Sequence, residues 1–299
     1  MKQFIFAAIG VLLSGVICSA AFAETLVVGS ISSNIKKETG RFAPLTAYLA
    51  EELQDAGISE VEIKVLPNSE TMSEALIAGD VDLFIDSPLI AAQMVRSADA
   101  VPMLRRWKDG VPEYHSVIMI AADSSIENLN DLTGKLVAFQ HADSSSGFVI
   151  PAAHLKQAGL SLVEIDSVRG GVSKGQTGFV FSGSDKYSVT LLSKGWVDAA
   201  GTDNKTYEEM NRDNPGKFRV LSRSVSVPRH VVLHAAHMEP ELVSKISGVL
   251  MDAETLPSGQ KMLKEFDNTV KFDPFPGGVD GTFQPIYEIL DIASTIERP

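Results

Sequence analysis

The sequence predicts an α/β fold in which helices flank largely parallel sheets. Short apolar strands alternate with helical segments from Leu26 onward. The same alternation repeats in the middle of the chain, which indicates two successive α/β units. The chain has 299 residues, a length that is natural for two packed domains.

Residues 1–23 have the features of a secretory signal peptide. A basic start is followed by an uncharged apolar run over residues 4–17 and by a small-x-small end at 21–23. Cleavage there leaves Glu24 as the first residue. The single cysteine, Cys18, lies in this segment and lacks the small preceding residue of a lipoprotein, so we expect a periplasmic protein without a lipid anchor or a disulfide. No later stretch is apolar for the roughly 20 residues of a spanning helix, so we expect no membrane insertion.

The first α/β unit begins with an apolar strand at 26–29. Pro44 is expected to open a helix, since its missing N–H costs nothing there, and leucines then recur every four residues until Gly57. Residues 61–65 alternate with period two and predict a strand. A helix at 69–78 stops at Gly79, and a strand at 81–85 leads into another helix.

The second unit begins with an apolar strand at 115–122. Further elements are expected in chain order: a short helix at 126–132, a strand at 135–139, a helix from 144 to 159, a helix at 186–193, and strands at 196–200, 217–222 and 231–235. Apolar residues every four positions predict a helix over 242–250, and 283–296 forms a last helix.

The charge balance excludes some classes of partner. The chain has 26 Lys and Arg against 38 Asp and Glu, a formal net charge of −12. Nucleic acids and anionic membranes are bound mainly through basic surfaces, so we expect no nucleic-acid partner.

The clearest candidate site is Asp143-Ser144-Ser145-Ser146-Gly147, between a strand and a helix. A helix start offers unpaired N–H groups and a positive dipole end, and clustered hydroxyls add neutral donors. Gly147 allows close approach of the backbone. This combination suits a tetrahedral oxyanion. The alternative is that one serine caps the helix and the others are loop residues.

Other polar residues follow predicted strands, where ligands bind in open α/β sheets. Tyr114 could present its hydroxyl to a ligand, or be a half-buried tyrosine with a solvated hydroxyl. The remaining candidates, each of which could equally be a cap or turn residue, are Ser32, Asp86, Ser87, Ser184, Asp185 and Asp203.

Signatures of enzymes are absent from the sequence: it has no G-x-S-x-G, Walker or H-E-x-x-H motif. His230, His234 and His237 cluster, but the first two span a predicted strand and lie too far apart for one metal ion. We therefore expect no catalysis, no metal and no cofactor; a secreted hydrolase using one of the serines is the enzymatic alternative.

Several motifs together resemble one family. The opening strand L-V-V-G, R-R-W-K-D-G-V-P-E-Y-H-S-V at 105–117, D-L-T-G-K-L-V-A-F at 131–139, D-S-S-S-G-F at 143–148, F-S-G-S at 181–184 and P-R-H at 228–230 are similar to those of the phosphate, phosphite and phosphonate-binding periplasmic proteins of ABC importers. The resemblance runs through most of the chain after the leader.

This resemblance implies a type II periplasmic binding fold, in which two α/β lobes joined by a hinge close over a ligand. It places residues 24–120 and 225–299 in lobe 1 and 121–224 in lobe 2. The family's serine run, which holds the oxyanion, falls on Ser144, Ser145 and Ser146, while Tyr114 and Asp203 match a family tyrosine and acid. Asp185 stands where phosphonate binders commonly have histidine, and Asp86 stands where small or aromatic residues are usual.

The expected function is that of a periplasmic solute-binding protein for phosphonate, phosphite or phosphate-type oxyanions. The expected partners are this ligand and the inner-membrane permease of an ABC importer, and the protein is expected to be a monomer. Two alternatives stay open: a ligand-sensing subunit of a membrane receptor kinase, and a binder of a different zwitterionic or cationic solute, for which the extra carboxylates would be suited.

Overall fold

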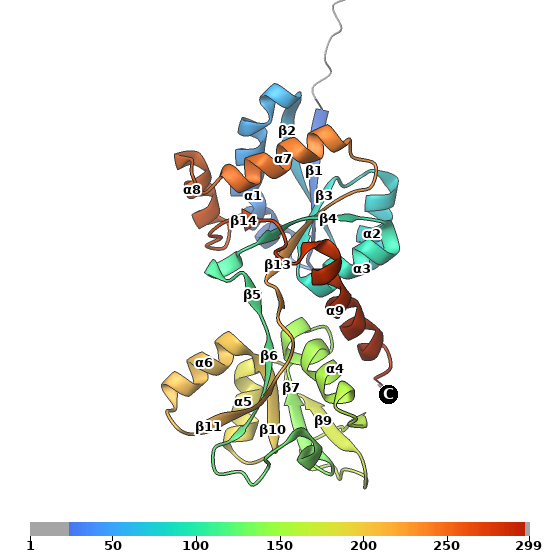
Figure 1. Cartoon of the computed structure of the whole chain (residues 1–299), viewed down its shortest axis with the longest axis vertical. Coiled ribbons are helices and arrows are strands. Elements are labelled where there is room, and N and C mark those ends of the chain that lie inside the picture. Colours follow the sequence, from blue (N-terminus) through green and yellow to red (C-terminus); the bar gives the residue numbers. More distant parts are fainter. Residues whose placement is uncertain (1–23, 297–299) are drawn as a thin grey trace, which may run out of the picture.

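The computed structural model describes residues 24–296, which form two α/β lobes joined by a narrow waist (Figure 1). Each lobe contains a six-stranded sheet, and a ribbon of β5 (Glu113–Tyr114) and β12 (Val227–Pro228) lies between the lobes. The predicted leader with Cys18 lies outside the described residues. Within residues 24–296, no helix is both long and apolar enough to cross a membrane.

The sheet of lobe 1 has the strand order β14-β4-β13-β3-β1-β2. Its strands are β1 (Glu24–Ile31), β2 (Ile58–Leu66), β3 (Leu83–Asp86), β4 (Val101–Arg106), β13 (His230–His234) and β14 (Phe272–Asp273). Strand β1 pairs in parallel with β2 and β3, whereas β13 is antiparallel to β3 and β4. The sheet is therefore mixed, because the chain re-enters this lobe from the waist in the opposite direction.

Helices cover both faces of the lobe 1 sheet (Figure 1). They are α1 (Ile35–Glu52), α2 (Ser69–Ala78), α3 (Pro88–Ala98), α7 (Pro240–Asp252), α8 (Pro257–Glu265) and α9 (Gly278–Ala293), with short 3-10 turns at Gln54–Ala56 and Lys108–Gly110. Two apolar clusters separate the helices from the sheet, one including Phe84 and Met94 and the other including Phe42 and Phe266.

The start of α1 differs from our expectation. The helix begins at Ile35, where the Asn34 side chain accepts a hydrogen bond of 3.0 Å from the amide of Lys37, and Pro44 lies inside it. Proline removes one intrahelical hydrogen bond, but the helix continues because Leu45 and Leu49 beyond it are fully buried.

The sheet of lobe 2 has the order β11-β6-β10-β7-β9-β8. Its strands are β6 (Ser116–Ala121), β7 (Leu136–Phe139), β8 (Leu162–Glu164), β9 (Thr177–Phe181), β10 (Ala199–Asp203) and β11 (Phe218–Arg223). Its helical segments are a 3-10 turn at Leu129–Leu132, a π-helical turn η4 (Ser145–Val149), α4 (Ile150–Gln157), α5 (Asp185–Ser193) and α6 (Asn204–Asp213). Only β6 is antiparallel to its neighbours β10 and β11.

The first crossing of the chain from lobe 1 to lobe 2 lies earlier in the sequence than the predicted boundary at residue 120. Strand β6 pairs with β10 and β11 of lobe 2, so the chain enters that lobe near residue 115. Ile296, the last residue that the structure describes, packs in the apolar core of lobe 2, not of lobe 1. An apolar strand pattern shows that a segment is buried, but not which of two sheets buries it.

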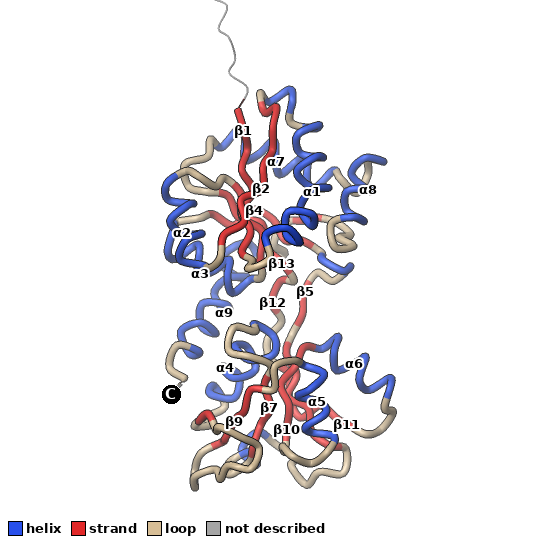
Figure 2. The backbone as a smooth tube through the Cα atoms, turned by 180° about the vertical axis from the view of Figure 1, so that it is seen from behind, coloured by secondary structure: helices blue, strands red, loops and turns tan. Residues whose placement is uncertain are grey.

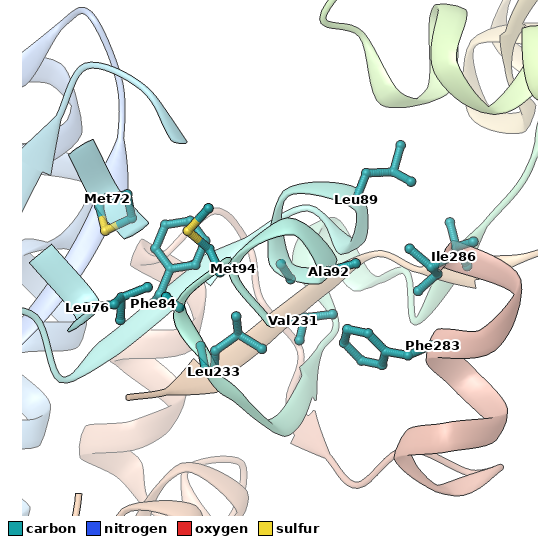
Figure 3. Close-up of a cluster of buried hydrophobic side chains, with 14 of the residues drawn as sticks. Met72, Leu76, Phe84, Leu89, Ala92, Met94, Val231, Leu233, Phe283 and Ile286 are labelled. Atoms are coloured by element: carbon teal, nitrogen blue, oxygen red, sulfur yellow. The ribbon is translucent and has the colours of Figure 1, made fainter. Parts of the chain in front are cut away.

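Helix α9 is a further connection between the lobes (Figure 1). Phe283 and Ile286 project from it toward α3 and β13 of lobe 1 (Figure 3). The same apolar cluster includes Ile150 and Ala153 of α4 in lobe 2. One apolar cluster therefore holds the two lobes together on the α9 side.

Candidate ligand-binding site

The serine segment forms the start of a helix, as expected. Ser144 is the cap: its hydroxyl accepts a hydrogen bond of 3.0 Å from the amide of Gly147 and donates to the side-chain oxygen of Gln140. The amides of Phe148 and Val149 bond the Ser144 carbonyl. Among residues 24–296, the amides of Ser145 and Ser146 have no hydrogen-bond acceptor, so two N–H groups remain available to a ligand.

Strand β6 stabilises this turn through a hydrogen bond from Ser116. The hydroxyl of Ser116, which is buried, donates to the Ser146 carbonyl over 2.8 Å. Gly147 is also buried, and the Gln140 amide bonds its carbonyl oxygen over 3.0 Å. Backbone and side-chain bonds thus fix the helix start rigidly against the sheet of lobe 2.

Tyr114 lies in the waist and interacts with groups from both lobes. Its side chain is buried, and the burial raises the pKa of its hydroxyl. The nearby Arg229 and a side-chain hydrogen bond with Ser145 lower this pKa, while the carboxylates of Asp203 and Asp86 raise it. Tyr114 therefore stays neutral at physiological pH and lies near three predicted site residues, Ser145, Asp203 and Asp86.

Two clefts open between the lobes, and Tyr114 lines one of them. One, of about 510 Å³, is lined by Tyr114, Ser146, Asp203 and Arg229, together with Asp109 and the first turns of α6. The other, of about 590 Å³, lies on the α9 side and is lined by Ser145 and by residues of both lobes, including Asn68, Ser69, Gln93 and Asp143. The tube view shows the two lobes facing each other across this region (Figure 2).

The lobe 1 candidates differ in their surroundings. Asp86 ends β3, and burial raises the pKa of its carboxyl group, an effect that hydrogen bonds with Ser87 and the cations Arg41 and Lys108 oppose. Ser87 precedes α3 without a side-chain capping bond. The Ser32 hydroxyl accepts a bond from the Asn34 amide, so it shapes the entry into α1. None of Asp86, Ser87 and Ser32 lines either cleft.

The lobe 2 acids lie near one another. Asp203 caps α6 by accepting bonds of 2.9 and 3.0 Å from the amide and hydroxyl of Thr206. The Asp185 carboxylate accepts a bond of 3.1 Å from the hydroxyl of Thr202. Burial and then the Asp203 carboxylate raise the pKa of Asp185. Ser184 is the cap of α5 and bonds the amide of Tyr187, so the structure gives it a local capping role.

Arg229 is a cleft residue that sequence reasoning missed. It lies between β12 and β13, and its guanidinium carbon is 5.5 Å from the centre of the Tyr114 ring. The pairing of Val227 with Tyr114 across the waist brings it there. The available signal was the P-R-H motif, which occurs in a predicted turn and by itself gives no indication of a site.

Comparisons with known proteins identify the family. Residues 30–276 match the model of the family described as "ABC transporter, phosphonate, periplasmic substrate-binding protein". The phosphate-import protein PhnD of Mycolicibacterium smegmatis is 27% identical over 236 residues, which cover 75% of this chain and 70% of that protein. These relatives are substrate-binding proteins of transport systems.

Solved structures show the same fold. XAC2383 from Xanthomonas citri bound to ATP is 25% identical, has a TM-score of 0.80, and the alignment covers 91% of this chain and 99% of that one. PhnD1 from Prochlorococcus marinus in complex with methylphosphonate is 20% identical with a TM-score of 0.61, over 91% of this chain and 99% of that one. The two-lobe fold is thus the type II periplasmic binding fold. The chain belongs to the family of periplasmic substrate-binding proteins of phosphonate ABC transporters.

Proposed function

We propose that this protein captures a phosphorus oxyanion of the phosphonate, phosphite or phosphate type between its two lobes, and that the ligand-bound form delivers it to the permease of an ABC importer. The observation on which this depends is the start of η4. Two amides without acceptors and the hydroxyls of Ser145 and Ser146 lie there beside the neutral hydroxyl of Tyr114.

Hydrogen bonds supply most of the affinity in this proposal. The helix dipole contributes about 0.3–2 kcal/mol, whereas each hydrogen bond to a charged group contributes about 1.5–3 kcal/mol. Lobe 1 then closes over the bound ligand. The ligand shifts the equilibrium between open and closed forms toward the closed form, because it contacts both lobes only there.

The carboxylates around the site restrict the charge of the ligand. A fully ionised oxyanion beside Asp203 is unfavourable unless a proton or a cationic group separates the two charges. A singly protonated oxyanion or a zwitterionic aminophosphonate meets this condition. The test panel therefore contains phosphate, phosphite, methylphosphonate and 2-aminoethylphosphonate, with ATP added because a relative binds it and with sulfate for comparison.

Thermal unfolding of the purified chain from Glu24 onward tests the proposal. A ligand that binds only the folded state, present at a hundredfold excess over its Kd, stabilises the protein by about 2.7 kcal/mol. We expect one phosphorus anion to raise the midpoint in the wild type and in Ser244→Ala, a control at an exposed serine of α7, but not in Ser145→Ala. If no phosphorus compound raises the midpoint of the wild type, the proposed ligand class is wrong.

The proposal includes three properties of the whole protein. Residues 1–23 direct export and are cleaved after Ala23, the exported protein is periplasmic, and it acts as a monomer. The intact mass of protein recovered from the periplasm checks the cleavage site, and light scattering during gel filtration checks the monomer.

A further inference from the structure

The cleft beside Tyr114 contains one weakly paired basic side chain. Arg229 lines the cleft of about 510 Å³, and 32% of its side chain is exposed. Its nearest carboxylate oxygen belongs to Asp109, which lines the same cleft, at 3.8 Å. That distance joins an ion pair but is too long for a hydrogen bond.

The neighbouring basic side chains lie closer to their carboxylate partner than Arg229 lies to Asp109. Arg41 and Arg106 bond the Asp267 carboxylate at 3.0 and 3.1 Å, and Lys108 lies 3.6 Å from it. Arg41 also pairs with Glu38. Among these four cations at the waist end of lobe 1, Arg229 has the longest ion-pair distance, and it alone lines the cleft.

A cation in this place would favour the binding of an oxyanion at the helix start. The donors at the helix start are neutral hydroxyls and amides, and carboxylates line the cleft at Asp109, Asp203, Glu208 and Glu209. The cleft also contains Lys205, which is exposed on α6. A charge-assisted hydrogen bond is roughly twice as strong as a neutral one, and a guanidinium can bond two oxygens of one phosphonate group.

We propose that Arg229 is the charged ligand-binding residue of this protein and that it exchanges Asp109 for the bound oxyanion when the lobes close. Asp109 is then a competing counter-ion that holds Arg229 in the ligand-free form. The inference rests on the proposed function, and it adds a residue and an ion-pair exchange to it.

The proposed exchange of ion-pair partners predicts that two substitutions change the affinity for the anion in opposite directions. Removing the guanidinium weakens anion binding, and removing the competing carboxylate strengthens it. Asp109 has a φ of 56°, in the left-handed region that asparagine adopts readily, so Asp109→Asn removes the charge without backbone strain. A merely structural role of Arg229 would not produce a gain of affinity in Asp109→Asn.

Isothermal titration at low salt measures both effects, with whichever of methylphosphonate and inorganic phosphate the wild type binds more tightly. We expect Arg229→Gln to lose roughly tenfold or more in affinity, since a hydrogen bond to a charged group is lost. Arg229→Lys should recover part of this loss, and Asp109→Asn should bind several-fold more tightly. Lys205→Gln is the matched control for a general change of charge in the cleft.

The double variant Arg229→Gln/Asp109→Asn shows whether Asp109 weakens anion binding by pairing with Arg229 or by the direct repulsion between its carboxylate and the anion. If Asp109 acts by holding Arg229, its removal brings little gain when Arg229 is already glutamine. An equal gain in both backgrounds, or a loss in Lys205→Gln as large as in Arg229→Gln, overturns the inference. Binding by the wild type with unchanged affinity in Arg229→Gln also refutes the inference but leaves the proposed function intact. Absence of binding to any phosphorus anion by the wild type refutes both.

Discussion

Replacing Gly147 by alanine should destabilise the helix start that holds the candidate site. A Cβ at this position would lie 2.6 Å from Cβ of Gln140, 2.9 Å from its side-chain oxygen and 2.9 Å from the hydroxyl oxygen of Ser144. Gln140 cannot move away freely, because its backbone N–H donates a hydrogen bond of 3.0 Å to the carbonyl oxygen of residue 147. The added methyl group must therefore displace Ser144 or open the turn.

The magnitude follows from the groups displaced. Overpacking costs about 1–3 kcal/mol, and loss of a serine cap costs about 0.5–2 kcal/mol. Alanine recovers up to about 1 kcal/mol of helix propensity relative to glycine. Because the first two effects involve the same atoms and do not add fully, we expect a net loss of roughly 2 kcal/mol.

Urea unfolding measures this loss, with Gly40→Ala as the matched control. Gly40 lies inside α1, and among the described residues no atom beyond its own stretch of helix backbone lies within 4 Å of the place that a Cβ would take there. Alanine should therefore stabilise the protein by about 0.5–1 kcal/mol. Affinity for the oxyanion should fall in Gly147→Ala alone, since the two free amides shift with the turn. If Gly147→Ala unfolds at the same urea concentration as Gly40→Ala, the argument from close packing is wrong.

Two further predictions concern the frame around the site. Ile286→Ala on α9 should destabilise the protein by about 2–5 kcal/mol, because Ile286 is fully buried in the apolar cluster shared by both lobes. The urea midpoint should move far less for the control Val279→Ala, since the Val279 side chain is 38% exposed. Equal shifts of the midpoint in the two variants would contradict the role of α9. At Asp267, burial raises the pKa, but Lys108, Arg106 and Arg41 outweigh it and hold the pKa below 3.8. Ion pairing by Asp267 therefore stabilises the fold above about pH 4 and is lost as the pH falls through the lowered value. Acid titration should show the stability advantage of the wild type over Asp267→Asn narrowing below pH 4, and a constant difference would refute this assignment.

Local patterns predicted the helix start well. A strand, a serine run and a glycine before an apolar helix are sufficient to place residues 144–147, because capping is decided within one turn. The start of α1 was mispredicted for a related reason. Asn34 and Pro44 both carry helix-start signals, and only burial of the leucines beyond Pro44 decides between them.

Elements without an apolar repeat escaped prediction. Helix α6 has no buried residue, so no periodic stripe marks it, although it carries Asp203 as its cap. The short strands β8, β9 and β14 and helix α8 were missed as well. Arg229 escaped for another reason: its position beside Tyr114 arises from pairing of β5 with β12, segments that are distant in the sequence.

The two sides of the waist differ in chemistry, and this difference directs how the lobes can move. On one side, α9 joins both lobes through a continuous apolar cluster, and Lys156 of α4 bonds the carbonyl of Thr295 over 3.0 Å. On the other side, the lobes meet through Tyr114, Arg229 and carboxylates across a cleft. Separating an apolar contact exposes its surface to water, whereas charged groups lose little when they part. We therefore expect closure to pivot on the α9 side and to bring Arg229 toward Ser146, the movement that an exchange of Asp109 for a bound oxyanion requires.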